Sequence, residues 1–211
     1  MPRWWWVLCG CLCAAWAQAG TQREEPLADA VRTALSVAVG VSGPPPGVVH
    51  GDAAAEQSYA RWLARTEVKL AQQLYKRSPA SAPQIAHELA NPELRREFLQ
   101  TVWYESQRAG LPVDLVLGLI QVESGFRKFA ISSSGARGYT QVMPFWTRQL
   151  SDGDASVLFQ AQANLRFGCV ILRHYLNVEE GNLHMALGRY NGSRGQMQYP
   201  NAVLAAQRQW Q

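Results

Sequence analysis

The sequence predicts an all-α protein, and three observations lead to that class. Apolar residues recur at helical spacing in several segments, most clearly at Val116, Leu119 and Ile120. Residues that favour helix starts, such as Asn91-Pro92, stand at the edges of these segments. No long stretch shows the strict apolar–polar alternation that is typical of a half-buried strand. With 211 residues, 47% of them apolar, the chain is long enough for one well-buried domain.

Residues 1–19 have the pattern of a secretory signal peptide. Met1-Pro2-Arg3 is a positive start, Trp4 to Trp16 is an apolar run too short to span a bilayer comfortably, and Ala17-Gln18-Ala19 is a small-residue cleavage pattern. We therefore predict cleavage after Ala19 and export. A lipoprotein-type processing site at Cys11 and an uncleaved anchor are the alternatives, and the shortness of the apolar run argues against both.

Residues 20–57 are interpreted as a tether with a short helix over 27–39. Three consecutive prolines, Pro44-Pro45-Pro46, stand in a Gly-rich setting between Gly40 and Gly51, and that composition favours an extended linker. Residues 58–98 are interpreted as a helical lead-in, because the pattern from Glu56 to Arg77 turns amphipathic. The apolar stripe of this helix consists of Tyr59, Trp62, Leu63, Leu70 and Leu74.

Residues 99–211 are predicted to form the main helical domain. Asn91-Pro92 opens a helix that runs into it, with asparagine as the N-cap and proline at the first helical position. Asn182 is a second candidate N-cap, and Tyr199-Pro200 a further helix start. The helices are expected over residues 91–110, 112–123, 145–150, about 155–177, 183–190 and 199–210.

Composition excludes several functional classes. Cys9, Cys11 and Cys13 leave with the signal peptide, and Cys169 remains on an apolar helical stripe, which favours a buried thiol over a nucleophile or a disulfide. The four histidines are scattered without paired ligand spacing, so no metal and no cofactor is expected. The net charge of +4 is compatible with an anionic wall or membrane surface. There is no basic cluster interleaved with aromatic residues, so no nucleic-acid partner is expected.

Glu123 is the candidate catalytic residue. It follows Val116, Leu119 and Ile120 on the same stripe, in the last turn of a helix that Pro112 begins and Gly125 ends. The negative end of the helix dipole and an apolar wall both disfavour a charged carboxylate there. The carboxyl group is therefore expected to stay protonated near neutral pH, as a general acid requires.

Three motifs around Glu123 resemble those of the soluble-type lytic transglycosylases. They are Glu123-Ser124, the run from Gly135 to Pro144 (GARGYTQVMP) and the run from Arg189 to Gly192 (RYNG). The resemblance covers roughly residues 99–200. It implies a goose-type-lysozyme-like fold and cleavage of bacterial peptidoglycan, in the periplasm or cell envelope. Where this family usually has Leu-Met and Ala, the chain has Tyr139-Thr140 and Arg189.

The resemblance also implies roles for individual residues. Glu123 would be the catalytic acid and base. The substrate-binding residues would be Ser124, Gln141, Met143, Tyr190 and Asn191. The hydroxyl of Tyr190 would point toward Glu123, whereas Met143 is also compatible with a place in the core. Gly135 and Gly138 are expected to allow a tight backbone path.

The implied reaction needs a single acid. No Asp or Glu occurs from Ser124 to Gln149, so a two-carboxylate glycosidase mechanism lacks its second group there. In the family, the 6-hydroxyl of the muramic sugar is the nucleophile, and a 1,6-anhydro end results. A hydrolytic muramidase of the same fold and an inactive wall-binding or secretion-apparatus scaffold are the alternatives. The expected partners are peptidoglycan strands, with recruitment by a cell-wall or secretion assembly as a further hypothesis.

Overall fold

Helices make up the regular structure of the protein, a computed structural model that describes residues 22–40, 52–77 and 88–211. They are α1 (Asp29–Gly40), α2 (Ala53–Arg77), η1 (Glu88–Ala90), α3 (Pro92–Arg108), α4 (Val113–Glu123), α5 (Phe145–Leu150), η2 (Ala155–Phe159), α6 (Ala161–Val178), α7 (Leu183–Asn191) and α8 (Gln198–Gln207). The described part contains isolated bridges of Arg137 with Ile131 and with Val142, but no strand. The all-α prediction is confirmed. Residues 1–19 and Pro44-Pro45-Pro46 lie outside the described ranges.

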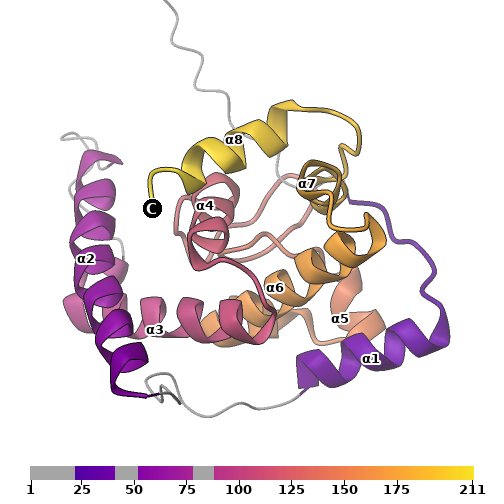
Figure 1. Cartoon of the computed structure of the whole chain (residues 1–211). Helices are drawn as coiled ribbons and strands as arrows, with labels where there is room; N and C mark the ends of the chain where they lie inside the picture. Colours follow the sequence, from indigo (N-terminus) through magenta and orange to yellow (C-terminus); the bar gives the residue numbers. More distant parts are fainter. Residues whose placement is uncertain (1–21, 41–51, 78–87) are drawn as a thin grey trace, which may run out of the picture.

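The short helix α4 stands at the centre of the core and carries Glu123 at its last position. Its apolar residues from Leu115 to Ile120 are almost completely buried. Helix α8 lies along it (Figure 1), and α3 packs on another side. Gly118 allows the close approach of α8, because a Cβ atom there would stand 2.7 Å from the backbone nitrogen of Gln207. The spacing of α4 and α8 therefore depends on a residue without a side chain.

Several helix ends follow the predicted capping chemistry. Asn91 Oδ1 accepts a hydrogen bond from the backbone N–H of Glu93 at 2.8 Å, and Asn182 Oδ1 accepts one from Met185 at 3.2 Å. After Glu123 the chain leaves α4 through Ser124 and Gly125, whose φ of 60° lies in the left-handed region. This turn ends α4 at the acid.

The predicted helix over about 155–177 is wrong in its first turn. Residues 155–159 form the 3₁₀ helix η2, with Asp154 accepting a hydrogen bond from the backbone N–H of Ser156 at 2.8 Å. Gln160 is extended and separates η2 from α6. The Asp154 side chain accepts a backbone hydrogen bond here and so favours a separate short helix. The spacing of apolar residues gives no sign of the break between η2 and α6.

Helix α2 belongs to the body of the domain. Tyr59, Trp62 and Trp103 of α3 form a cluster of rings, with the Trp62 and Trp103 centroids 4.7 Å apart. At its other end, Gln73 donates a hydrogen bond to Gln209 Oε1 at 2.9 Å. Helix α3 also runs continuously through residue 98. The boundary predicted between residues 98 and 99 therefore falls inside one packed helix.

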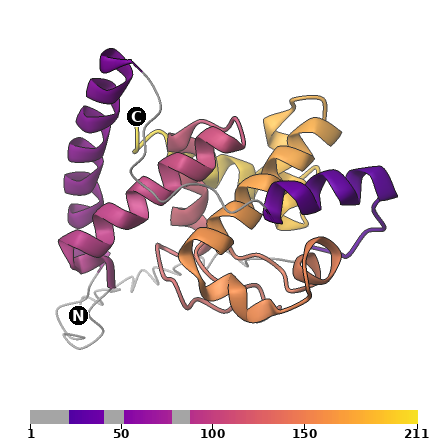
Figure 2. The same ribbon diagram turned by 90° about the horizontal axis from the view of Figure 1, so that it is seen from below.

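The tether interpretation of residues 20–57 needs correction over residues 22–40. The predicted short helix is present as α1, but it packs against α5 and α6 at the opposite end of the molecule from α2 (Figure 2). Val39 is buried, and Arg108 of α3 donates a hydrogen bond to the carbonyl of Ala38 at 3.1 Å. The tether interpretation rests on the Pro/Gly-rich composition between Gly40 and Gly51, which follows α1. That composition carries no information about the long-range contacts of α1 itself.

Cys169 is buried on α6, in line with the predicted apolar stripe of that helix. No helix in the described ranges is long and apolar enough to cross a membrane.

Candidate active site

Glu123 lies in a buried, largely apolar position. Its side chain ends an almost fully buried helix, and the residue is only 8% exposed. Burial raises the pKa of Glu123 to about 8, and a hydrogen bond from Tyr199 partly opposes that shift. The carboxyl group is therefore protonated at neutral pH, as the sequence predicts.

Tyr199 is the direct partner of the acid. Its hydroxyl donates a hydrogen bond to Glu123 Oε1, and α8 places it there by lying against α4. The third motif suggests Tyr190 as the tyrosine whose hydroxyl points toward Glu123, but the hydrogen bond to the acid comes from Tyr199. The Tyr190 hydroxyl donates to the backbone carbonyl of Thr140 at 2.8 Å. The charge of Glu123 helps to raise the pKa of Tyr190, which indicates that Tyr190 nevertheless lies near the acid.

Gln141 holds the loop of the second motif from inside. Its φ of 50° is uncommon for a residue with a side chain, and the residue is 4% exposed. Its Nε2 donates hydrogen bonds to the carbonyls of Gly138 at 2.9 Å and Ala130 at 3.1 Å. The amide nitrogen thus fixes the local backbone, which holds Gln141 in this strained conformation. Saccharide binding by Gln141 stays a prediction.

Gly138 permits the tight path that the sequence predicts. Its φ is 76°, and a Cβ atom there would stand 2.4 Å from the carbonyl oxygen of Leu158. Gly135 also has a positive φ, of 86°, but open space around it. Of these two glycines, Gly138 is the one that combines a positive φ with close packing.

The other predicted binding residues have structural contacts of their own. The Ser124 hydroxyl donates to the carbonyl of Ile120 at 3.2 Å and so bonds the end of α4. Met143 is half-buried and packs against the core. Asn191 Nδ2 donates to Ser193 Oγ at 3.0 Å, in the corner that ends α7. Their contacts with a saccharide remain predictions.

Three residues differ from the usual family motifs: Tyr139, Thr140 and Arg189. Among the described residues, the side-chain contacts of these three are with groups other than Glu123. Tyr139 packs on Phe98 and donates its hydroxyl hydrogen bond to Glu88. Thr140 Oγ1 donates to Asn164 Oδ1 at 2.9 Å. Arg189 forms ion pairs with Glu179 and Glu25. All three substitutions thus support the surrounding fold.

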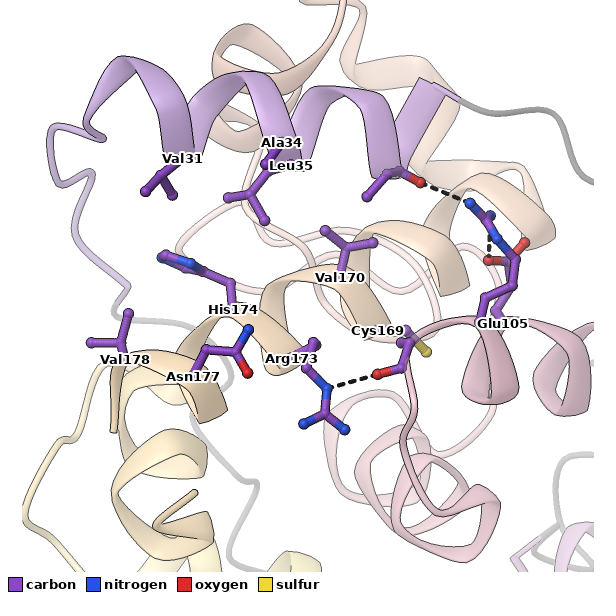
Figure 3. A pocket seen from close by; sticks show the side chains of 13 residues that line it. Val31, Ala34, Leu35, Glu105, Cys169, Val170, Arg173, His174, Asn177 and Val178 are labelled. Carbon is purple, nitrogen blue, oxygen red and sulfur yellow. Dashed lines mark hydrogen bonds and ion pairs between the residues drawn. The ribbon is translucent and has the colours of Figure 1, made fainter. Parts of the chain in front are cut away.

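A cavity of about 500 Å³ lies under α1 (Figure 3). Neither Glu123 nor Tyr199 is among the residues that line it. Val31, Ala34 and Leu35 point into it from α1, and Cys169 and Val170 face them from α6. Burial raises the pKa of the Cys169 thiol, so this thiol stays protonated and unreactive. The cavity therefore does not add a nucleophile to the site.

Metal ligands are also sparse. In the ranges that the structure describes, no three His, Cys, Asp or Glu side chains gather in a group that could hold a metal ion.

Fold and site together define a class: an all-helical domain with one protonated carboxyl group at the end of its central helix, suited to glycan chemistry. Comparison with known families makes this specific. Residues 100–209 match the model of the transglycosylase SLT domain, which covers about half of the chain. The chain belongs to this family, whose fold is lysozyme-like and helical.

Curated relatives carry the name membrane-bound lytic murein transglycosylase C. The protein from Haemophilus influenzae is 40% identical over 65 residues, which is 30% of this chain and 17% of the relative. That from Mannheimia succiniciproducens is 43% identical over 49 residues, 23% of this chain and 14% of the relative. That from Actinobacillus pleuropneumoniae is 32% identical over 85 residues, 36% and 23% of the two chains. The chain thus matches less than a quarter of the length of these relatives. No solved structure matched it.

Proposed function

We propose that this protein is a peptidoglycan lytic transglycosylase that cleaves the MurNAc–GlcNAc β-1,4 bond and leaves a 1,6-anhydroMurNAc end. The observation that carries the proposal is the buried Glu123, whose pKa of about 8 keeps the proton available at neutral pH. Family membership and the names of the relatives support the same reaction.

In the first step, protonated Glu123 donates its proton to the glycosidic oxygen. The bond from this oxygen to the anomeric carbon breaks, and positive charge develops on the muramic ring. The resulting Glu123 carboxylate accepts a hydrogen bond from Tyr199, which stabilises its charge inside an apolar environment.

In the second step, the 6-hydroxyl of the same ring attacks the anomeric carbon. Glu123 takes the hydroxyl proton and returns to its starting state, so no water is consumed. An intramolecular hydroxyl has an effective concentration on the order of 10⁵ M or more when it is well oriented. No Asp or Glu occurs from Ser124 to Gln149, so the second motif beside Glu123 supplies no other carboxylate. This favours the single-acid route over hydrolysis with two carboxylates.

The substrate-binding roles of Ser124, Gln141, Met143, Tyr190 and Asn191 belong to this proposal and rest on their motif positions. So does delivery to the periplasm by the export signal predicted over residues 1–19. Recruitment by a cell-wall or secretion assembly would bring the enzyme to its strands.

Digestion of purified peptidoglycan with mass analysis of the muropeptides tests the reaction. We expect anhydro ends, which are lighter by one water than hydrolytic ends. Glu123→Gln should give no product while it keeps a native circular dichroism spectrum. Hydrolytic ends would identify a muramidase, and undiminished cleavage by Glu123→Gln would refute the single acid.

A further inference from the structure

The segment that follows the catalytic helix carries an exposed apolar surface. Phe129 is 67% exposed and Ile131 is 64% exposed, only a few residues beyond Glu123. The ring of Phe129 lies 5.9 Å from that of Phe159, which is half-buried in η2. We call Phe129, Ile131 and Phe159 the aromatic platform. Large apolar side chains gathered on a surface mark an interaction site more often than scattered ones do.

Two cations flank the platform. Lys128 Nζ stands 5.4 Å from the ring centre of Phe129, and the Arg137 guanidinium stands 5.6 Å from that of Phe159. Arg137 also pairs with Ile131 through a bridge, which places the two side chains next to each other on this surface. Lys128, Phe129, Phe159, Arg137 and Ile131 therefore form one continuous patch.

The platform is held in a fixed shape. Arg137 Nη1 donates a hydrogen bond to the carbonyl of Ala155 at 2.9 Å, which joins the loop of the second motif to η2. A rigid apolar surface can bind a partner with little loss of conformational entropy. The patch thus has the properties of a preformed binding surface.

Charges at the edge of the patch discriminate between occupants. Lys128 pairs with Glu88 at 3.8 Å and lines a pocket of about 490 Å³ together with Glu88 and Glu97. These carboxylates offset the cations of the patch, whereas an anionic membrane favours clustered cations without nearby carboxylates. A peptide stem carries both carboxylates and amines and is compatible with this mixture of charges.

We propose that the aromatic platform is a second glycan-binding surface, outside the bond-cleaving centre. A sugar ring of the strand packs its apolar C–H face on Phe129, and Lys128 binds a carboxylate of the attached peptide. The proposal rests on peptidoglycan being the substrate of Glu123. It assigns to this surface a role in holding peptide-bearing strands.

Binding of purified peptidoglycan by the full chain with Glu123→Gln tests the platform without chemistry. Adding Phe129→Ala should weaken co-sedimentation about tenfold, and Phe129→Tyr should keep it within about twofold. Tyr75→Ala is the matched control, since Tyr75 is an 85% exposed aromatic residue on α2 and should not matter. Lys128→Gln should weaken binding to intact peptidoglycan and leave unchanged the binding to strands stripped of their peptides by an amidase.

The possible outcomes separate the two proposals. Undiminished binding by Phe129→Ala, with thermal unfolding unchanged, overturns the platform whatever the digestion products are. If Phe129→Ala weakens binding to anionic lipid vesicles but not to peptidoglycan, the platform is also overturned, in favour of a membrane contact. Phe129-dependent binding to peptidoglycan supports the platform even if the wild-type protein releases no anhydro ends, in which case only the proposed reaction fails.

Discussion

At the scale of single residues, Tyr199 makes the contact with Glu123 that the motif position suggests for Tyr190. Tyr199 reaches Glu123 from 76 positions away, and Tyr190 bonds the backbone of Thr140. Tyr199→Phe removes a hydrogen bond that lowers the Glu123 pKa, so the pKa should rise above about 8. The high-pH limb of the activity profile should then move to higher pH. Turnover should fall about ten- to a hundredfold, because the developing carboxylate loses roughly 1.5–3 kcal/mol.

Tyr190→Phe is the matched control for this prediction. It leaves Thr140 without one hydrogen bond and should reduce thermal stability more than it shifts the pH profile. Steady-state kinetics on a defined glycan oligomer across pH distinguish the two. A pH profile that moves only with Tyr190→Phe would return the acid-tuning role to Tyr190.

Glu123 itself makes stability depend on pH. Its pKa is about 8 in the folded protein and 4.5 ordinarily, so between these values the folded state holds a proton that the unfolded state has lost. Stability should therefore fall as pH rises from about 4.5 to about 8, by up to about 1.4 kcal/mol per pH unit from this group. Glu123→Gln removes the titration and should raise the melting temperature more at pH 8 than at pH 5. Equal gains at both pH values would contradict a buried, protonated acid.

At the scale of elements, the sequence predicts what is decided locally. Asn91, Asn182 and Gly125 mark helix ends through bonds within a few residues, and those ends are found. The partner of Glu123 could not be identified in the same way, because Tyr199 has no local relation to it. Likewise, Gln22 of the supposed tether accepts a hydrogen bond from Trp146 at 3.0 Å and donates one to the carbonyl of Tyr190. Contacts over such separations depend on how helices pack, which periodicity does not encode.

The packing of α8 on α4 can be tested through Gly118. A methyl group there would stand 2.9 Å from the carbonyl of Val203 and 2.7 Å from the nitrogen of Gln207, so the helices would have to separate. We expect Gly118→Ala to cost about 1–3 kcal/mol of stability despite the better helix propensity of alanine. Turnover should fall as well, because the shift would move Tyr199 relative to Glu123. Gly135 has a positive φ and open space around it. Gly135→Ala therefore measures the cost of backbone strain alone, for comparison with the cost of the close contact at Gly118. Unchanged chemical denaturation of Gly118→Ala would show that the two helices adapt freely.

At the scale of the whole molecule, the folded unit extends beyond the family match at residues 100–209. Helix α2 buries Trp62, Leu63 and Leu74, and Leu70 is fully enclosed. At about 1.5–3 kcal/mol for each large apolar side chain, this contribution is comparable with the roughly 5–15 kcal/mol that stabilises a typical domain. Removing α2 would also expose the facing surface of α3.

A truncation series follows from this packing. A chain of residues 88–211, which contains Glu123, Gln141, Tyr190 and Tyr199, should lose cooperative thermal unfolding and activity because the α2 contacts are gone. A chain of residues 52–211 should keep a cooperative transition at a lower melting temperature, since it lacks α1 and the hydrogen bonds of Gln22 to Trp146 and Tyr190. Calorimetry of both, beside a chain of residues 20–211, measures the two contributions separately. If residues 88–211 unfold as cooperatively as residues 20–211, with equal activity, the N-terminal helices are accessories, and the family match alone is the folding unit.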